Sequence, residues 1–264
     1  MDCKSCIELE VCDNTESSCT RKVVLVVGTN CKDNIGAGVV EKFKAEGYEV
    51  VTADIHNGAD VFMDVTNKYN VNQVFEGIKR KYGRLDMVLP CHGINLLGAI
   101  GEYPEEYWDK TIDINLKGLF LLLQAYVSHF DNDGRRKVFL PITSDTSEIP
   151  KTSTFAYGAS KAGANHFLRC TARELNKYHT DDWVITGLAI GMVTGTAMDA
   201  KTIADVAAQR NISQEKAAAM LVANIPIGRG LTTHEVAEWV YFVATKGDYC
   251  SGNILRIDAG QCQG

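Results

Sequence analysis

From residue 21 onward, short runs of β-branched and apolar residues alternate with longer stretches in which apolar residues recur every three or four positions. The short runs predict strands that are buried on both faces of a sheet. We expect seven of them, at 23–28, 48–55, 59–63, 85–93, 137–144, 184–191 and 253–260. The longer stretches predict helices at 36–46, 68–82, 104–130, 155–178 and 232–245. This alternation predicts an α/β fold with a doubly wound, seven-stranded parallel sheet and helices on both faces.

One segment departs from the alternation. Residues 197–225 read as two helices with no strand between them, and residues 211–213 separate the two. Insertions between regular units often carry binding functions on a rigid scaffold. We therefore expect a helical substrate lid at about 195–226.

Length and charge narrow the class of protein. The chain has 264 residues, which favours one domain, at 22–264, after an N-terminal tail at 1–21 that we expect to be flexible. The net charge of −6 provides no basic field for a phosphate backbone, so nucleic acid is not an expected partner.

No apolar stretch approaches the roughly 20 residues that span a bilayer. We expect a cytoplasmic protein that does not bind membranes.

Nine cysteines occur in the chain, and their odd number and scattered positions argue against a disulfide framework. The tail contains a C-x-x-C pair, Cys3 and Cys6, that could supply half of a zinc site. Cys12 and Cys19 are not closely spaced and no His lies near them. We therefore predict no metal and regard the tail thiols as incidental.

A glycine-rich segment, GTNCKDNIGAG, follows the first strand. Ligands of open α/β sheets bind beyond the carboxyl ends of the strands, and the free N–H groups at a helix start can bind a pyrophosphate. The alternative is an ordinary βα turn that carries glycines. The residues expected to contact a dinucleotide here are Gly28, Asn30, Asn34, Ile35 and Gly36, with Gly38 also available for close approach.

Two acidic residues at strand ends bear on the choice of dinucleotide. Asp54 lies 26 residues after Gly28, where a carboxylate can accept hydrogen bonds from the ribose hydroxyls of NAD and would repel the 2′-phosphate of NADP. Lys32 could partly offset that repulsion. NAD is therefore the predicted cofactor, and NADP the alternative. Asp64, with Val65 beside it, either holds the adenine amino group or caps the next turn.

Three polar residues suggest proton-transfer chemistry. Ser144 ends a strand, and Tyr157 and Lys161 lie four residues apart on one face of the next predicted helix. A nearby ammonium, together with an oxidised nicotinamide, can favour the phenolate of Tyr157. Tyr157 would then act as general acid and base, and Ser144 would donate to the developing oxyanion. The alternative is a pair on the helix surface.

These residues resemble the short-chain dehydrogenase/reductase family over residues 22–261, because that family has Lys four residues after its Tyr and Ser thirteen residues before it. The segment DINLKGLF resembles the family's active-site Asn segment. The resemblance implies a Rossmann-type fold, and that Asn115 orders a water through which Lys161 relays protons, although Asn115 could instead simply bend a helix. It also implies that Lys161 binds the nicotinamide ribose, and that the C-terminal region forms a homotetramer or else a dimer.

The sequence departs from the family pattern in three places. The glycine loop is two residues longer, Pro90–Gly93 replaces an Asn-Asn-Ala-Gly-like segment, and Ile190 replaces a Pro before Gly191. We expect His92 to line the cofactor cleft and to bond to the backbone, rather than to titrate or bind metal. The remaining expected cofactor contacts are Gly93, Gly191, Val193 and Thr196.

The sequence thus predicts an NAD(H)-dependent oxidoreductase that interconverts a secondary alcohol and a ketone on a small molecule. An NADP(H)-dependent ketoreductase and a non-catalytic dinucleotide-binding protein are the alternatives. A reductase of C=C bonds, as in the enoyl reductase branch of the family, is disfavoured. That branch has its Tyr seven residues before the Lys, where this chain has Thr154.

Overall fold

The computed structural model describes residues 21–29, 33–179 and 182–261, so the N-terminal tail, Asn30 and Lys32 lie outside the described residues. All seven predicted strand segments form strands. The main sheet has the order β3-β2-β1-β4-β5-β7, and every registered pair in it is parallel. Its strands are β1 (Val23–Val27), β2 (Glu49–Asp54), β3 (Val61–Phe62), β4 (Met87–Pro90), β5 (Lys137–Phe139) and β7 (Trp183–Ile185).

Two of the predicted strands are each split into two. The segment at 137–144 breaks at Pro141, which lacks the N–H needed to continue the ladder, and the segment at 184–191 breaks at Thr186. Their second halves, β6 (Ile142–Ser144) and β8 (Gly187–Ile190), pair with β9 (Ile254–Ile257) in a three-stranded parallel sheet. The Leu188 N–H still donates to the Pro141 carbonyl, so one sheet leads into the other.

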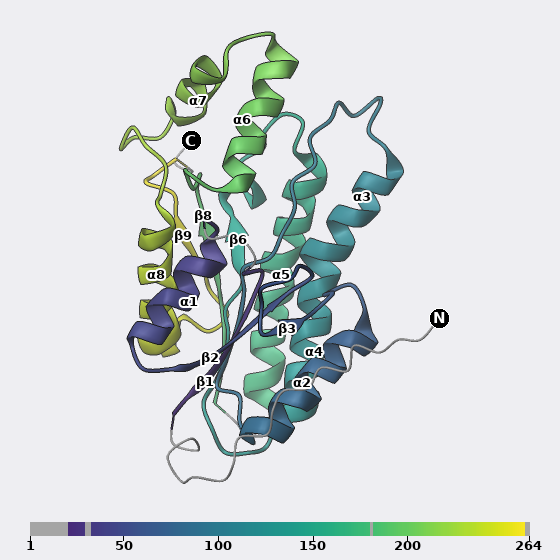
Figure 1. Cartoon of the computed structure of the whole chain (residues 1–264), viewed down its shortest axis with the longest axis vertical. Helices are drawn as coiled ribbons and strands as arrows, with labels where there is room; N and C mark the ends of the chain where they lie inside the picture. The colour runs from purple at the N-terminus through teal and green to yellow at the C-terminus, as the bar shows by residue number, and fades with distance from the viewer. Residues whose placement is uncertain (1–20, 30–32, 180–181, 262–264) are drawn as a thin grey trace.

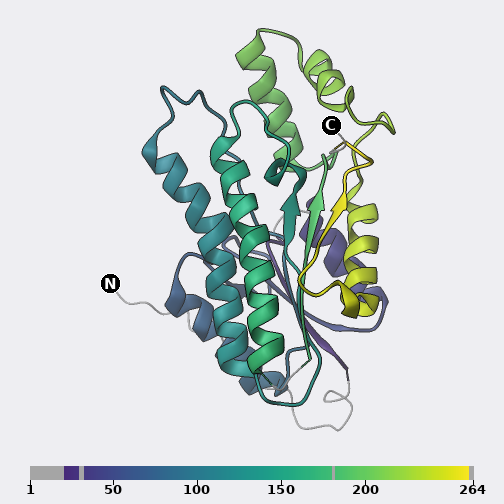
Figure 2. The same cartoon turned by 180° about the vertical axis from the view of Figure 1, so that it is seen from behind.

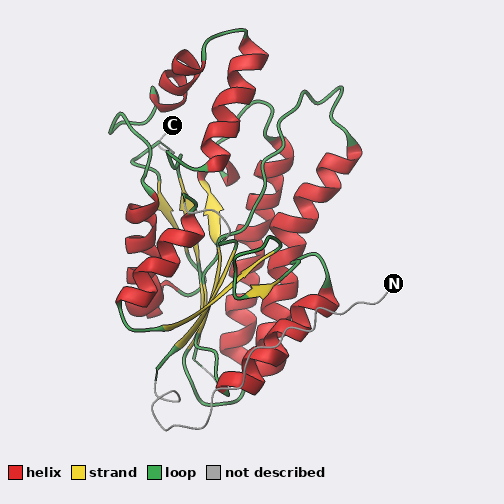
Figure 3. Cartoon of the chain, in the orientation of Figure 1, coloured by secondary structure: helices red, strands yellow, loops and turns green. Residues whose placement is uncertain are grey.

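Helices cover both faces of the sheet, as a doubly wound fold requires (Figures 1, 2 and 3). On one face α1 (Ile35–Ala45) packs against α8 (Thr233–Lys246), and Phe43 and Val240 are fully buried there. On the other face lie α2 (Lys68–Tyr82), α4 (Gly118–Phe130) and α5 (Phe155–Tyr178). The ends of α1, α2, α5 and α8 lie within one residue of the predicted ends, and α4 ends at the predicted residue 130.

The predicted helix at 104–130 is in fact three segments. A π-helical turn, Asp113–Lys117, separates α3 (Glu105–Ile112) from α4. Such turns bulge a helix locally and are frequent at functional sites. This one contains Asn115, so the alternative that Asn115 bends a helix agrees with the structure, and its role in ordering a water stays a prediction.

The segment predicted as a lid forms two helices, α6 (Ala197–Arg210) and α7 (Gln214–Val222), which rise beyond the carboxyl ends of the strands (Figure 1). Their role as a substrate lid stays a prediction, and we call them the lid helices. Thr196 and Ser213 cap their amino ends through side-chain oxygens. Asn211, with a φ of 51°, ends α6 in the left-handed conformation that Asn tolerates. No helix in the described part of the chain is long and apolar enough to cross a membrane.

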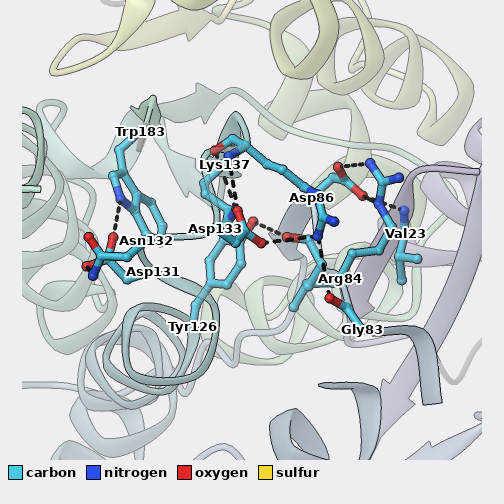
Figure 4. Close-up of polar contacts among 12 residues, drawn as sticks. Val23, Gly83, Arg84, Asp86, Tyr126, Asp131, Asn132, Asp133, Lys137 and Trp183 are labelled. Atoms are coloured by element: carbon cyan, nitrogen blue, oxygen red, sulfur yellow. Dashed lines mark hydrogen bonds and ion pairs between the residues drawn. The ribbon is translucent and has the colours of Figure 1, made fainter. Parts of the chain in front are cut away.

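The amino ends of the strands, opposite the lid helices, carry a buried polar network (Figure 4). The fully buried ammonium of Lys137 forms an ion pair with Asp133. Arg84 bonds both oxygens of Asp86 at 2.6 and 2.9 Å, and Asp86 also accepts from the Val23 N–H at 2.8 Å. This network fixes the first residues of β1 and β5, so its role is structural.

Asp133→Asn is expected to destabilise the fold by about 3 kcal/mol, because it removes the carboxylate that pairs with the fully buried ammonium of Lys137. Urea denaturation measures this. The matched control is Asp205→Asn, which breaks the exposed pair with Lys201 on α6 and should cost less than about 0.5 kcal/mol. Equal losses of stability in the two variants would contradict the structural role of the buried pair.

Candidate active site

A cleft of about 1370 Å³ opens at the carboxyl ends of the strands, below the lid helices. Its walls come from the residues that follow β1, β2, β4, β6 and β8, and from α6 and α7. Sites for one small molecule usually measure about 300–1,000 Å³. The cleft therefore has room for a dinucleotide and a second, smaller molecule.

The glycine loop forms a tight backbone cradle at one end of the cleft. Gly28 has a φ of +92°, and a Cβ on it would lie 2.7 Å from the His92 backbone nitrogen. A Cβ on Gly36 would lie 2.1 Å from the Gly28 carbonyl oxygen. The Asn34 side chain accepts from the Ala37 N–H at 2.7 Å and donates to the Gly28 carbonyl at 3.3 Å. The longer loop thus still brings Gly28 against the start of α1, where Ile35 lines the cleft.

Gly36→Ala is expected to raise the Kd for dinucleotide at least about tenfold and to destabilise the protein by about 1–3 kcal/mol, because the new methyl group meets backbone that cannot rotate away. Isothermal titration with NADH and urea denaturation measure the two effects. Gly101→Ala is the control, since nothing lies within 4 Å of its Cβ position and its φ is not positive. Unchanged dinucleotide affinity in Gly36→Ala would contradict the cradle.

Asp54 and Asp64 both line the cleft, but they differ in their contacts. Asp54 is buried at the end of β2, where its carboxylate accepts from the N–H groups of Thr29 at 2.8 Å and His56 at 3.1 Å. Asp64 uses one oxygen to cap a turn, accepting from the N–H and the hydroxyl of Thr66 at 2.9 and 2.7 Å. The turn-capping alternative for Asp64 is therefore present, and contact of Asp64 and Val65 with adenine stays a prediction.

His92 bonds to the backbone, as expected. Its Nε2 lies 3.2 Å from the Ile114 carbonyl oxygen. Burial, and then the nearby charge of Lys161, lower the pKa of His92 to about 4, so the imidazole is neutral and Nε2–H donates to that carbonyl. The ring therefore lines the cleft without carrying charge near neutral pH.

Asn115 clamps the segment after β4 in place. Its Oδ1 accepts from the Ile94 N–H at 2.9 Å, and its Nδ2 donates to the Ile94 carbonyl at 2.8 Å and to the Ser160 hydroxyl at 3.1 Å. Gly93 permits this approach, because a Cβ there would lie 3.3 Å from Asn115 Oδ1 and 3.5 Å from Lys161 Nζ. Asn115 is thus next to Lys161, whereas its ordering of a relay water stays a prediction.

Ser144, Tyr157 and Lys161 converge on the floor of the cleft. Lys161 Nζ lies 5.6 Å from the centre of the Tyr157 phenol ring, and Ser144 lies close enough to the phenol to oppose the rise of its pKa. Lys161 Nζ also donates to the Ile142 carbonyl at 2.9 Å, which fixes its position on the strand that ends in Ser144. The alternative of a surface pair on α5 is wrong, because Lys161 is buried.

Burial dominates the ionisation of both groups. It raises the pKa of Tyr157 to about 12, against the opposing effect of the Ser144 hydrogen bond and with a further rise from the charge of Asp145. It lowers the pKa of Lys161 to about 8. Lys161 alone therefore does not bring the Tyr157 pKa toward neutrality, since desolvation of the phenolate has the largest effect.

The other expected contacts also line the cleft. Gly191 and Val193 follow β8, and Thr196 caps α6 by accepting from the Asp199 N–H at 3.1 Å. No group of three or more potential metal ligands occurs among residues 21–29, 33–179 and 182–261.

Sequence reasoning missed an ion pair beside Ser144. Asp145 is buried, and it accepts from the Ser144 hydroxyl at 3.1 Å and from Lys151 Nζ at 2.7 Å. Both residues line the cleft. The sequence did contain one indication of this pair, because a charged residue, Asp145, directly follows Ser144 at the end of a buried strand.

Comparison with known proteins identifies the family. Residues 28–261 match the family model described as Enoyl-(Acyl carrier protein) reductase, a match over most of the chain. The chain belongs to the short-chain dehydrogenase/reductase family. Sorbitol-6-phosphate 2-dehydrogenase of Klebsiella pneumoniae is 27% identical over 95% of this chain and 100% of its own length. NAD-dependent glycerol dehydrogenase of Listeria innocua is 30% identical over 91% of this chain and 94% of its own length.

The fold agrees with this membership. Ligand-free aldohexose dehydrogenase of Thermoplasma acidophilum superimposes with a TM-score of 0.81 at 22% identity, covering 92% of this chain and 95% of that one. At that identity the likeness shows the fold alone. From its family and its named relatives, this short-chain dehydrogenase/reductase is an oxidoreductase that acts on CH–OH groups and uses a nicotinamide dinucleotide.

Proposed function

We propose that this protein is an NAD(H)-dependent dehydrogenase that interconverts a secondary alcohol and a ketone, with Tyr157 as general acid and base. The observation that carries the proposal is the convergence of Ser144, Tyr157 and Lys161 on the floor of a cleft that has a glycine cradle at one end. Three polar groups from a strand end and the following helix meet where hydride chemistry would take place.

The residues present fit a dinucleotide. A Cβ at Gly28 or Gly36 would collide with neighbouring backbone, so glycine lets the loop pack tightly there, and the α1 start beside it offers N–H groups to a pyrophosphate. Asp54 stands at the end of β2, where ribose hydroxyls can donate to its carboxylate. A 2′-phosphate would meet that charge at close range, which favours NAD(H) over NADP(H). The bound nicotinamide would supply or accept the hydride.

The chain's own residues manage the proton. During alcohol oxidation the Tyr157 phenolate takes the hydroxyl proton, and in ketone reduction the phenol returns it to the same oxygen. The Ser144 hydroxyl donates to that oxygen as negative charge develops on it. Lys161 holds a positive charge close to the phenol ring. Because burial raises the Tyr157 pKa, alkaline pH favours oxidation and neutral pH favours reduction.

Reduction of a C=C bond is a weaker candidate, although the matching family model is described as an enoyl reductase. The position seven residues before Lys161 is Thr154, which has no phenol, whereas Tyr157 occupies the position four residues before it. A non-catalytic role is disfavoured by the complete set of Ser144, Tyr157, Lys161 and Asn115.

Small polyols are the substrate class we propose. The lid helices contribute the apolar residues Met198 and Leu221 to the lining of the cleft, and Thr146 and Thr152 also line it. The Klebsiella and Listeria relatives are named for a polyol phosphate and for glycerol. A panel of polyols, polyol phosphates, hydroxy acids and steroids, followed through NADH absorbance, tests the proposal. Turnover of steroids without turnover of any polyol would reject this substrate class.

Association into a homotetramer, or else a dimer, is also proposed. Trp239 and Phe242 on α8 are 42% and 56% exposed and pack edge to face at 6.3 Å, which leaves an aromatic surface open to a second copy. Mass photometry of the purified protein tests this proposal, and a monomer at micromolar concentration would reject it.

A further inference from the structure

We propose that Asp145 and Lys151 are positioning residues that hold the Ser144 hydroxyl and set the pH range in which Tyr157 exchanges its proton. This inference rests on the proposed function, because it concerns the same proton transfer. It adds a charged pair to the Ser, Tyr, Lys and Asn set.

A chain of contacts runs from Ser144 to the cleft wall. Ser144 lies close enough to the Tyr157 phenol to affect its pKa, and the Ser144 hydroxyl lies 3.1 Å from both Asp145 Oδ1 and Thr146 Oγ1. The other oxygen of Asp145 accepts from Lys151 Nζ at 2.7 Å. The Thr146 N–H donates to Ser144 Oγ at 3.2 Å, so the serine oxygen is fixed from both sides.

Burial makes this contact consequential. The Asp145 side chain is 2% exposed and that of Lys151 is 35% exposed, so the carboxylate is buried while its ammonium partner still reaches solvent. A carboxylate removed from water requires a partner charge, and Lys151 supplies it. The negative charge of Asp145 disfavours the phenolate and raises the pKa of Tyr157. Lys151 counteracts that effect, so the two charges act on Tyr157 in opposite directions.

Other charged or titratable groups near Tyr157 come from different elements. Lys161 Nζ on α5 lies 5.6 Å from the centre of the phenol ring. The two groups after β4 are neutral, because burial raises the pKa of the Cys91 thiol to about 12 and lowers that of His92 to about 4. The remaining charged residues of the cleft are Asp54, Asp64, Lys110, Asp113, Asp199 and Arg210. Among the described residues, Asp145 is the carboxylate that contacts Ser144 directly.

The charge of Asp145 favours one direction for the serine proton. Two acceptors, Asp145 Oδ1 and Thr146 Oγ1, lie 3.1 Å from Ser144 Oγ, and without substrate the proton should be donated to the charged one. When a substrate oxygen develops negative charge in the cleft, it competes for that proton, and the hydroxyl turns about its own C–O bond while its oxygen stays in place. Asp145 therefore keeps Ser144 in position between turnovers.

Four variants separate charge from positioning. Asp145→Asn keeps an acceptor for Ser144 and removes the charge, so the alkaline rise of kcat for oxidation should move to lower pH by about one unit. Lys151→Gln leaves Asp145 uncompensated and should move that rise to higher pH by a similar amount. Lys151→Arg keeps the charge and should leave the profile in place. Asp145→Ala should shift the profile as Asn does and also lower kcat, by about tenfold.

The readout is the kcat profile from pH 6 to 10, with NADH affinity and circular dichroism as checks on folding. Opposite shifts in Asp145→Asn and Lys151→Gln support the inference, since a purely structural role moves neither. If one of these variants does not fold, the direction of the shift in the other decides. An active wild type whose variants show no shift, or shifts of the same sign, overturns this inference alone. A wild type that oxidises no alcohol overturns the proposed function as well.

Discussion

Tyr157→Phe is expected to lower kcat in both directions by about 10²- to 10⁴-fold, the usual contribution of a positioned general acid and base. The phenol oxygen is the only heavy atom removed from the side chain, and Tyr157 lines the cleft together with Ser144. The ring remains to fill its space, so the fold and the cofactor cradle should persist. The Kd for NADH should therefore change by less than about threefold.

The control for that variant is Tyr178→Phe, on the same helix but 70% exposed and far along α5 from the cleft. It should leave both kcat and the Kd for NADH at wild-type values. Steady-state kinetics and fluorescence titration with NADH measure the two quantities. Wild-type turnover in Tyr157→Phe would show that another group transfers the proton.

Asp54→Asn is expected to shift cofactor preference toward NADP(H) by roughly a hundredfold, measured as the ratio of kcat/KM for the two cofactors. At an effective dielectric constant of about 20, two unit charges 5 Å apart interact by about 3 kcal/mol, which corresponds to that ratio. Asn keeps one acceptor oxygen, which can serve the shorter bond from the Thr29 N–H, while the bond from the His56 N–H is lost. A ratio of the two cofactors isolates the effect of charge, because the lost backbone bond should affect both cofactors alike.

Asp64→Asn provides the comparison for cofactor preference. Asp64 also lines the cleft, but its predicted partner is the adenine, which NAD and NADP share. Its replacement should weaken both cofactors to a similar extent and leave their ratio unchanged. A preference for NADP(H) in the wild type, or no change in the ratio for Asp54→Asn, would contradict the assignment of Asp54.

Hydrophobic periodicity predicted where the helices and strands of this fold lie, but not where some of them are interrupted. The three- and four-residue spacing of apolar residues places α2 and α5 at their observed bounds, because each helix buries one apolar face against the sheet. The same signal could not show the π-helical turn at Asp113–Lys117, since one extra residue in a turn barely alters the period. It also missed the break at Pro141, where apolar residues continue on both sides.

The sequence predicted the site residues whose positions follow from their spacing along the chain. Tyr157 and Lys161 share a helical face, and Ser144 ends the preceding strand, so their convergence follows from local structure. The pair of Asp145 and Lys151 depends on how the loop before α5 folds back, which no local pattern specifies. The sequence also could not predict that the pKa of Tyr157 is raised, because this rise depends mainly on the burial of the phenol.

Hydride transfer itself tests the central claim most directly. The purified protein would be mixed with the keto form of a substrate from the panel and with NADH that carries deuterium on one or the other face of the nicotinamide C4. Mass spectrometry of the alcohol product should show one added deuterium at the carbinol carbon from one of the two labelled cofactors. Absence of label in the product from both cofactors would contradict the assignment of this protein as an NAD(H)-dependent alcohol dehydrogenase.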